Sequence, residues 1–460
     1  MTFDSCISPL DYRYLRNKKA HNAIMPYFSE ESYTKYKLRV ESALAEALAK
    51  HNICSKKVAD EIAGASEKVT AEEVFEEEER IKHDIRALAN CIRNKVSEEA
   101  KPFVHFLATS YDIVDTANAL RYKEFSEKEL IPLLNELERE LISIAEREKN
   151  TLQIGRTHGQ HAEPITFGFA IASYVNRVGS RIETITNAKN ALCGKMSGAV
   201  GAYNASSVIF ENAEDFEKTT LDILGIKPAL HSTQIVPPEP IADLAHAAVS
   251  TFSVLANFSD DMRNLQRSEI SEVGELFGKD QVGSSTMPHK RNPITFENIK
   301  SIYKAFMPRM TTVYLDQISE HQRDLTNSAS QRFLPELFGA LYASILRITD
   351  AVKKLSVDKE HMNANFNKSK EHVAAEPLYI LLAKAGHPDA HEAVRKLTLL
   401  AQKEEKGIVE LAENDSSLKN YIEKISSKNM LALKSPEKYI GRSAAKTDEV
   451  CTFWKNKLKL

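Results

Sequence analysis

The chain has 460 residues, a length that allows two or three domains and a large buried core. Hydrophobic residues make up 42% and charged residues 27%, as in an ordinary soluble globular protein. The formal net charge of -3 provides no basic footprint for nucleic acid or for an anionic membrane. Any anionic ligand must therefore be bound by cations that are placed locally.

The cysteines and the apolar runs indicate a soluble, cytoplasmic protein. The five cysteines lie far apart and form no CxxC pair, which is typical of reduced thiols rather than of disulfides or a zinc site. The first residues include two aspartates and no apolar run, so we expect no signal peptide. No stretch approaches the roughly 18 uninterrupted apolar residues of a membrane span.

Four long segments repeat apolar residues every three or four positions, which predicts helices that bury one face. They span residues 134–144, 167–192, 241–265 and 333–355. No Gly or Pro follows the third segment before Gly274, so this helix is expected to reach about 30 residues. Because alternating strand patterns are scarce, we predict an all-α fold built around an extended bundle of long helices.

Two polar motifs in the first quarter of the chain have two interpretations each. Lys82-His83-Asp84 follows an acidic run and forms either a carboxylate–imidazole pair or the end of a solvated acidic helix. Thr109 and Ser110 precede an apolar helical pattern, so they are helix caps, ligand-binding hydroxyls, or both. A helix N-terminus is itself a good anion site, which makes the two roles compatible.

The segment Gly155–His161 holds two histidines three residues apart, His158 and His161. They are candidates for a metal pair, for hydrogen-bonded residues at a helix start, or for acid–base catalysis near neutral pH. No third ligand follows at a recognised spacing, which argues against a metal site. The glycine-rich run from Gly194 lacks the GK[ST] ending of a phosphate-binding P-loop.

Two further segments combine cations with hydroxyl groups. Gly283–Pro293 places Ser284 and Ser285 before Lys290, a composition suited to a lid that closes over an anion, or to a solvated loop. Arg323, Ser328 and Arg332 are spaced so that the last two would share a helix face. They form either an anion-binding group or surface ion pairs with Asp324 or Glu336.

These motifs resemble, in content and order, the fumarase/aspartase superfamily, whose members release fumarate from a substituted succinate. The form of the 283–293 loop resembles the adenylosuccinate lyase branch, and the resemblance covers nearly the whole chain. In chain order the motifs read SPLDYRY (8–14), KHD (82–84), ATSYD (108–112), GRTHGQHAEP (155–164), GKMSGAVGAYNA (194–205), STQ (232–234), GSSTMPHKRNP (283–293), QRDLTNSASQR (322–332) and YIGR (439–442).

The resemblance implies a role for each matching residue. Ser284 matches the base that removes a proton beside the C–N bond, and His158 matches the acid that protonates the leaving nitrogen. Lys290 stabilises the negative charge, and Glu297 keeps His158 charged and oriented. Substrate contacts are implied for Arg13, Tyr14, Lys82, His83, Asp84, Thr109, Ser110, Gln234, Asn292, Arg323, Ser328 and Arg332. Two departures stand out, since most relatives carry Arg or Asn at Lys82 and many have a more basic segment after Gln234.

The resemblance also implies the substrates and the assembly. The substrates are adenylosuccinate, which gives AMP, and its imidazole-carboxamide counterpart SAICAR, which gives AICAR, in purine nucleotide biosynthesis. No metal or organic cofactor is required. Three helical domains are expected, at residues 1–107, 108–364 and 365–460, in a homotetramer whose active sites are shared between subunits. A 30-residue helix extends roughly 45 Å, so motifs at its opposite ends cannot meet within one subunit.

Two alternatives have a basis in the sequence. The carboxymuconate cycloisomerase branch of the same superfamily resembles this chain at Met287–Pro293, but it handles no nucleotide and usually lacks a histidine at the place of His158. A catalytically silent helical oligomer is the alternative from a different class. The joint presence of Ser284, His158, Lys290 and Glu297 argues against it.

Overall fold

The structure is a computed structural model that describes residues 8–276, 286–287 and 289–460. By its internal contacts the chain divides into two compact units, each made of three segments. Unit 1 comprises residues 1–135, 180–255 and 301–347, and unit 2 comprises residues 136–179, 256–300 and 348–460. This division by contacts does not test the expected three-domain organisation, which stays a prediction.

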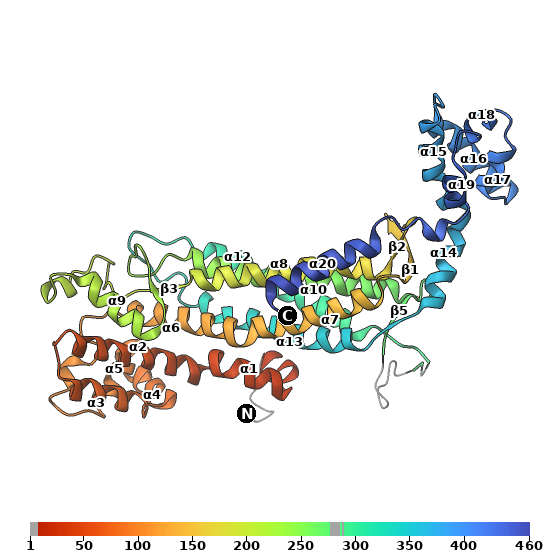
Figure 1. Ribbon diagram of the computed structural model, residues 1–460. Helices are drawn as coiled ribbons and strands as arrows, with labels where there is room; N and C mark the ends of the chain where they lie inside the picture. Colours follow the sequence, from red (N-terminus) through yellow and green to blue (C-terminus); the bar gives the residue numbers. More distant parts are fainter. Residues whose placement is uncertain (1–7, 277–285, 288) are drawn as a thin grey trace. The chain divides into compact units, whose positions relative to one another are not determined.

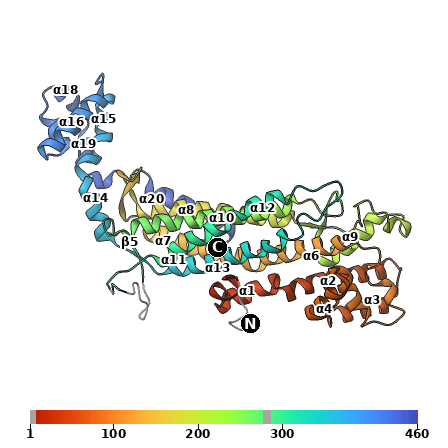
Figure 2. The same cartoon turned by 180° about the vertical axis from the view of Figure 1, so that it is seen from behind.

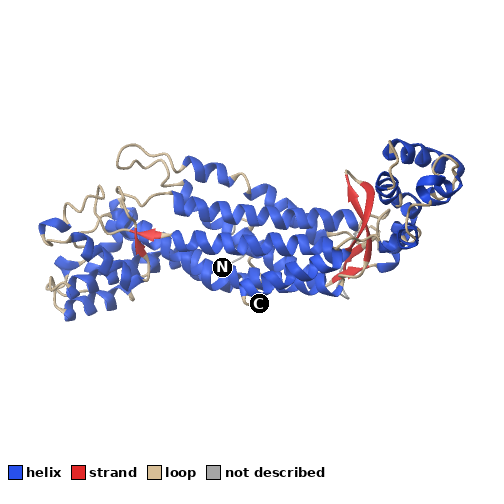
Figure 3. Ribbon diagram, turned by 45° about the horizontal axis from the view of Figure 1, so that its top comes forward, coloured by secondary structure: helices blue, strands red, loops and turns tan. Residues whose placement is uncertain are grey.

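Helices make up most of the described chain, which confirms the predicted fold class (Figure 3). The strands are short and form three two-stranded sheets, of which two are antiparallel and one is parallel. The strands are β1 (Leu152–Thr157), β2 (Gln160–Thr166), β3 (Cys193–Gly194), β4 (Lys227–Pro228), β5 (Val273–Glu275) and β6 (Leu355–Val357). The cysteines within the described residues, Cys54, Cys91, Cys193 and Cys451, are free, as expected for reduced thiols.

Five helices contribute residues to both units: α7 (Ile131–Arg147), α8 (Phe167–Ala191), α10 (Glu239–Leu265), α11 (Ile294–Phe306) and α13 (Leu334–Lys353). Four of them match the predicted long helices, and the longest, α10, has 27 residues. By length and composition α10 would pass for a membrane span, but 67% of its most apolar window is buried. Burial of this kind is typical of a core helix.

Unit 1 is built on α2 (Glu30–Lys50), which packs against α3 (Lys56–Ser66), α6 (Ser110–Phe125) and α9 (Ala213–Leu224). Aromatic rings fill part of its core, with the Phe28 and Phe125 centroids 4.7 Å apart and those of Tyr122 and Phe338 5.1 Å apart. Figures 1 and 2 show α2 to α5 packed together. The remaining helices that lie wholly in this unit are α1 (Lys18–Phe28), α4 (Ala71–Ile81), α5 (Asp84–Arg93) and α12 (Arg309–Leu315).

Unit 2 contains a hydrophobic cluster of its own near the C-terminus, formed by buried residues between Ala374 and Leu433. The helices that carry it, α15 to α19, gather together in Figure 1. The last helix, α20, packs its Trp454 against α8, where the indole Nε1 donates to Asn176 at 3.0 Å. The helices found only in this unit are α14 (Lys359–Val373), α15 (Ala375–Lys384), α16 (Ala390–Glu404), α17 (Ile408–Asn414), α18 (Lys419–Ile422), α19 (Ser427–Leu433) and α20 (Ser443–Leu458).

We expect Gly179→Ala to lower the free energy of unfolding by about 1–3 kcal/mol, because a Cβ at Gly179 would lie 2.3 Å from the Trp454 indole. The matched control is Gly64→Ala in α3, where no heavy atom lies within 4 Å of the added Cβ. Alanine favours a helix over glycine, so the control should unfold at the same or a higher urea concentration. Equal midpoints for the two variants would contradict the close packing of α20 on α8.

Candidate active site

The predicted site residues fall into two groups, one in each unit. In unit 2, His158 lies in the turn between β1 and β2, so its motif forms a hairpin and not the start of a helix. His158 and Gly159 have φ values of 53° and 76°, and Thr157 pairs with Gln160 across them. Positive φ at both turn residues matches the right-handed twist of a hairpin. The turn holds the His158 side chain at the exposed tip.

His161, by contrast, has a structural contact. Its Nδ1 lies 2.6 Å from the Ser369 hydroxyl of α14, and burial together with the nearby Arg156 lowers the pKa of the imidazole. Of the two histidines, His158 is thus the one with an exposed side chain, and its acid–base role stays a prediction. Among the described residues, no group of three or more His, Cys, Asp or Glu side chains is arranged to hold a metal ion.

The hairpin is held by Glu272, a residue that the sequence did not single out. This carboxylate is fully buried and accepts hydrogen bonds from Gln153 at 2.8 Å, Arg156 at 2.5 Å and Asn365 at 2.9 Å. A buried carboxylate needs such donors, since an unpaired charge in the interior is costly. Glu272 thereby fixes β1 relative to α14 and to the strand β5 that follows it.

Glu275 joins the described residues on either side of the 283–293 loop. Its carboxylate accepts from the Thr295 hydroxyl and, at 3.1 Å, from the Thr295 backbone N–H at the start of α11. Gln266 adds a contact from its side-chain amide to the Arg291 carbonyl at 3.1 Å. Ser284 lies outside the described residues. The loop's two flanks are therefore fixed to one another.

The other predicted catalytic residues of unit 2 are exposed. Lys290 follows a turn in which its N–H donates to the Met287 carbonyl at 3.0 Å, and Glu297 lies in the first turn of α11. Neither His158 nor Glu297 makes a side-chain hydrogen bond or ion pair within the part of the chain that the structure describes. Asn292, the remaining residue of this group, is half-buried.

In unit 1, the KHD motif is the junction between α4 and α5. Lys82 ends α4 with a φ of 58°, and His83 caps α5 by accepting the Arg86 N–H on its Nδ1 at 3.2 Å. The same Nδ1 lies 3.7 Å from an Asp84 carboxylate oxygen. The two side chains are therefore near one another, although side chains of adjacent residues do not usually face each other on a helix. Because Nδ1 already accepts the Arg86 N–H, it does not donate to Asp84, so His83 acts as a helix cap and the carboxylate–imidazole pair stays a prediction.

Three segments of unit 1 meet at the start of α6. Thr109 is the N-cap residue of this helix, and Ser110 is its first residue. The ring of Tyr111 stacks beneath Arg323, whose guanidinium carbon lies 3.7 Å from the ring centroid. Nε and Nη1 of this guanidinium are buried and have no hydrogen-bond partner among the described residues. Buried donors without partners are suited to an anionic ligand. The third nitrogen, Nη2, donates to Asn327 at 3.4 Å.

Gln234 joins the same region, because its N–H donates to the Gln322 carbonyl at 3.3 Å, next to Arg323. Ser328 lies in a turn and Arg332 in a short 3-10 helix, so the two do not continue one α-helix as their spacing suggested. The alternative was that these arginines form surface ion pairs with Asp324 or Glu336. Glu336 pairs with Arg309 at 2.6 Å, whereas Arg323 and Arg332 form no ion pair among the described residues.

Arg13 and Tyr14 lie in a short helical turn at Leu10–Tyr14, with Arg13 exposed and Tyr14 half-buried. Unit 1 thus holds every predicted substrate contact except Asn292, and unit 2 holds the predicted catalytic residues. The sequence missed the partners that hold these residues in place. Tyr111 lies within the ATSYD motif, where an aromatic residue among polar ones could have indicated a binding role. No feature of the sequence around Glu272 indicated that this carboxylate is buried.

The comparisons with known proteins agree along the chain. A family model described as lyase matches residues 16–306, and one described as adenylosuccinate lyase C-terminal matches residues 319–440. The adenylosuccinate lyase of Pyrococcus abyssi is 36% identical over 97% of this chain and 98% of its own length. The adenylosuccinate lyase of Methanocaldococcus jannaschii is 34% identical over 98% of this chain and 96% of its own length.

Among solved structures, a fumarate lyase from Mesorhizobium sp. BNC1 superposes with a TM-score of 0.81 at 20% identity, covering 94% of this chain and 97% of the other. A 3-carboxy-cis,cis-muconate lactonizing enzyme from Pseudomonas putida gives a TM-score of 0.81 at 21% identity, covering 95% and 97%. At these identities the likeness concerns the fold. With the sequence matches over nearly its full length, the chain belongs to the adenylosuccinate lyase family of the fumarase/aspartase superfamily.

Proposed function

We propose that this lyase eliminates fumarate from adenylosuccinate, giving AMP, and from SAICAR, giving AICAR. The observation that carries the proposal is the similarity, over nearly the full length of both chains, to relatives named adenylosuccinate lyase. The residues that the reaction requires are present in this chain. No metal or organic cofactor takes part in the proposed reaction.

The nucleotide end of the substrate requires locally placed cations, because the protein as a whole carries a formal net charge of -3. Arg323 supplies two buried donors without partners among the described residues, and Tyr111 fixes the plane of its guanidinium. We assign the substrate phosphate to Arg323, with Arg13, Tyr14, Ser328 and Arg332 as further contacts. Thr109 and Ser110, at the N-terminus of α6, are assigned to a substrate carboxylate, where the helix dipole favours negative charge.

The elimination needs a base on one side of the C–N bond and an acid on the other. Ser284, as its alkoxide, takes the proton from the carbon next to the C–N carbon, and the C–H electron pair forms a dianionic enolate. Lys290, Asn292 and backbone amides stabilise this charge. As the enolate collapses to fumarate, the C–N electron pair moves to the nitrogen, and His158 as imidazolium protonates it. Glu297 keeps the imidazolium charged and oriented.

The proposal includes a cytoplasmic homotetramer with three helical domains per chain, in which His158, Ser284 and the His83 region of one site come from different chains. Two features support it. His158 and Glu297 are exposed and lack side-chain partners among the described residues, although the chemistry requires them to meet. Unit 1 also exposes large apolar side chains in its third segment, which a partner chain would cover. These are Tyr314, Leu315, Ile318, Leu325 and Phe333.

The proposed activity is tested by mixing the purified protein with adenylosuccinate and following the ultraviolet change on conversion to AMP. SAICAR is tested in a parallel reaction. Each reaction should proceed at the same rate before and after the protein is dialysed thoroughly against a chelator. Loss of activity on chelation, restored by a divalent ion, would contradict the cofactor-free mechanism.

We expect Arg323→Lys to raise KM for adenylosuccinate about tenfold or more, with kcat changed little, because it removes guanidinium donors that bind the substrate before and during reaction. The matched control is Tyr111→Phe, which keeps the ring beneath the guanidinium and should change KM less than about threefold. Steady-state kinetics on both variants measure the difference. A kcat loss with unchanged KM in Arg323→Lys would remove Arg323 from the phosphate site.

A further inference from the structure

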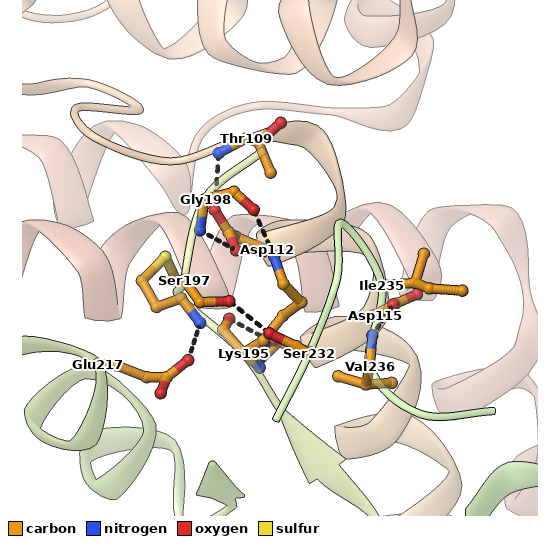
Figure 4. Close-up of polar contacts among 12 residues, drawn as sticks. Thr109, Asp112, Asp115, Lys195, Ser197, Gly198, Glu217, Ser232, Ile235 and Val236 are labelled. Carbon is orange, nitrogen blue, oxygen red and sulfur yellow. Dashed lines mark hydrogen bonds and ion pairs between the residues drawn. The ribbon is translucent and has the colours of Figure 1, made fainter. Parts of the chain in front are cut away.

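Unit 1 contains a fully buried ion pair that the proposed mechanism does not use. The Lys195 ammonium contacts a carboxylate oxygen of Asp112, and both side chains are 0% exposed (Figure 4). The same ammonium donates to the Gly198 carbonyl at 3.1 Å. Burying two charges costs more than it returns unless geometry and additional hydrogen bonds are very good. The contacts around the pair therefore indicate its purpose.

Asp112 bonds two segments that lie far apart in the sequence. One oxygen accepts the Thr109 N–H at 2.8 Å, and the other accepts the Gly198 N–H at 3.2 Å. Thr116, one turn further along α6, adds two contacts to the backbone of Lys195, accepting its N–H at 3.1 Å and donating to its carbonyl at 3.0 Å. The glycine-rich loop is thus fixed to the first two turns of α6, where the proposed carboxylate site begins.

The glycine-rich loop in turn contacts the segment that carries Gln234. The hydroxyls of Ser197 and Ser232 lie 2.6 Å apart in the interior. Gly201 has a φ of 76°, and a Cβ there would lie 2.1 Å from the Ser232 carbonyl oxygen. Only glycine fits this approach.

A second contact fixes the other side of Gln234. Asp115, on α6, accepts the Val236 N–H on its carboxylate at 2.9 Å, and burial raises the pKa of this carboxyl to about 7. Gln234 therefore lies between two anchors, Ser232 and Val236, which lead back to the same two turns of α6. Figure 4 shows these contacts together.

We propose that Lys195 and Asp112 are positioning residues, which set the separation between Thr109–Ser110 and Gln234, two groups of substrate contacts. The proposal rests on the proposed function for the identity of the substrate. Neither charge touches the substrate. A buried ion pair serves this purpose better than an apolar contact because its hydrogen bonds have fixed directions and one arrangement satisfies all of them.

The test begins with Lys195→Met, which removes the charge and shortens the unbranched side chain by only one atom. We expect KM for adenylosuccinate to rise about tenfold or more while kcat falls less than about threefold, because ground-state and transition-state contacts are lost together. Ile62→Ala, in the core of α3 and 1% exposed, is the control for lost stability. It should lower the melting temperature and leave KM unchanged. An unchanged KM in Lys195→Met would overturn the proposal.

A double variant separates positioning from stability. Lys195→Met leaves a buried, unpaired carboxylate. Adding Asp112→Asn removes that charge and keeps one of the two acceptor oxygens, so the melting temperature should recover in part. KM should stay raised, because the bridge from Lys195 to Gly198 is still missing. Recovery of KM together with the melting temperature would show that the pair only stabilises the fold. If Lys195→Met does not fold, Ser197→Ala replaces it in the test. KM should then rise about threefold, and the melting temperature should fall less than in Ile62→Ala, whose KM stays unchanged.

Hydrogen exchange without substrate keeps this test independent of the proposed function. In Lys195→Met the amides of residues 196–203 and 232–236 should exchange faster together, while those of α3 keep their protection. Loosening of only the first segment would contradict the link to Gln234. A wild-type protein that did not cleave adenylosuccinate would instead count against the proposed function, and the exchange result would still decide whether Lys195 fixes both segments.

Discussion

His158→Asn is expected to lower kcat for adenylosuccinate at least ~10²-fold, because asparagine cannot deliver a proton to the leaving nitrogen. Asparagine tolerates the left-handed φ of 53° at this turn, so the hairpin should be retained. Stability should change little, since the His158 side chain is exposed and has no partner within the described chain. Steady-state kinetics and a thermal unfolding curve measure the two effects.

The matched control for this variant is His161→Asn on the same hairpin. His161 contacts Ser369 at 2.6 Å, so its replacement should affect stability more than it affects kcat. Near-normal turnover in His158→Asn, or an equal loss of kcat in both variants, would remove His158 from the role of acid.

Ser284→Ala is expected to lower kcat at least ~10²-fold as well, because the hydroxyl is the proposed base. Ser284 lies outside the described residues, so this expectation depends on the sequence motif alone. Its neighbour provides the control, since Ser285→Ala removes the same group one residue away and should retain more activity. Comparable losses in the two variants would leave the identity of the base open to Ser285 and contradict the assignment.

The two inactive variants together test the shared site. If His158 and Ser284 of one site come from different chains, random reassembly of equal amounts should restore about a quarter of the sites. Activity should therefore return on mixing His158→Asn with Ser284→Ala after dissociation. Mixed tetramers that stay inactive, or a fully active monomer in light scattering, would contradict a site shared between subunits.

The sequence predicted the long helices well because their signal is local and repeats. In α10 the apolar residues recur every three or four positions up to Leu265, where the helix ends after 27 residues, slightly short of the expected length of about 30. The hairpin was missed because β1 and β2 are short, and only Gly159 marks the turn. A six-residue strand that pairs with its neighbour through a bulge carries little periodic signal.

The sequence motifs give a set of candidate site residues but not the arrangement of these residues in space. Motif resemblance assigned Arg323 and Thr109, but their proximity through Tyr111 depends on packing between segments more than 200 residues apart. The Lys195–Asp112 pair was hidden for the same reason. A lysine in a glycine-rich run is usually exposed, and only its burial against α6 distinguishes it.

The most direct test of the central claim is product analysis with the purified wild-type protein, chelator-treated, after complete reaction with adenylosuccinate. Proton NMR should show AMP and fumarate in equal amounts, and none of either in a parallel reaction with Ser284→Ala over the same time. The absence of fumarate from the wild-type reaction, together with lactone formation in a separate reaction supplied with 3-carboxy-cis,cis-muconate, would contradict the assigned activity and favour a cycloisomerase.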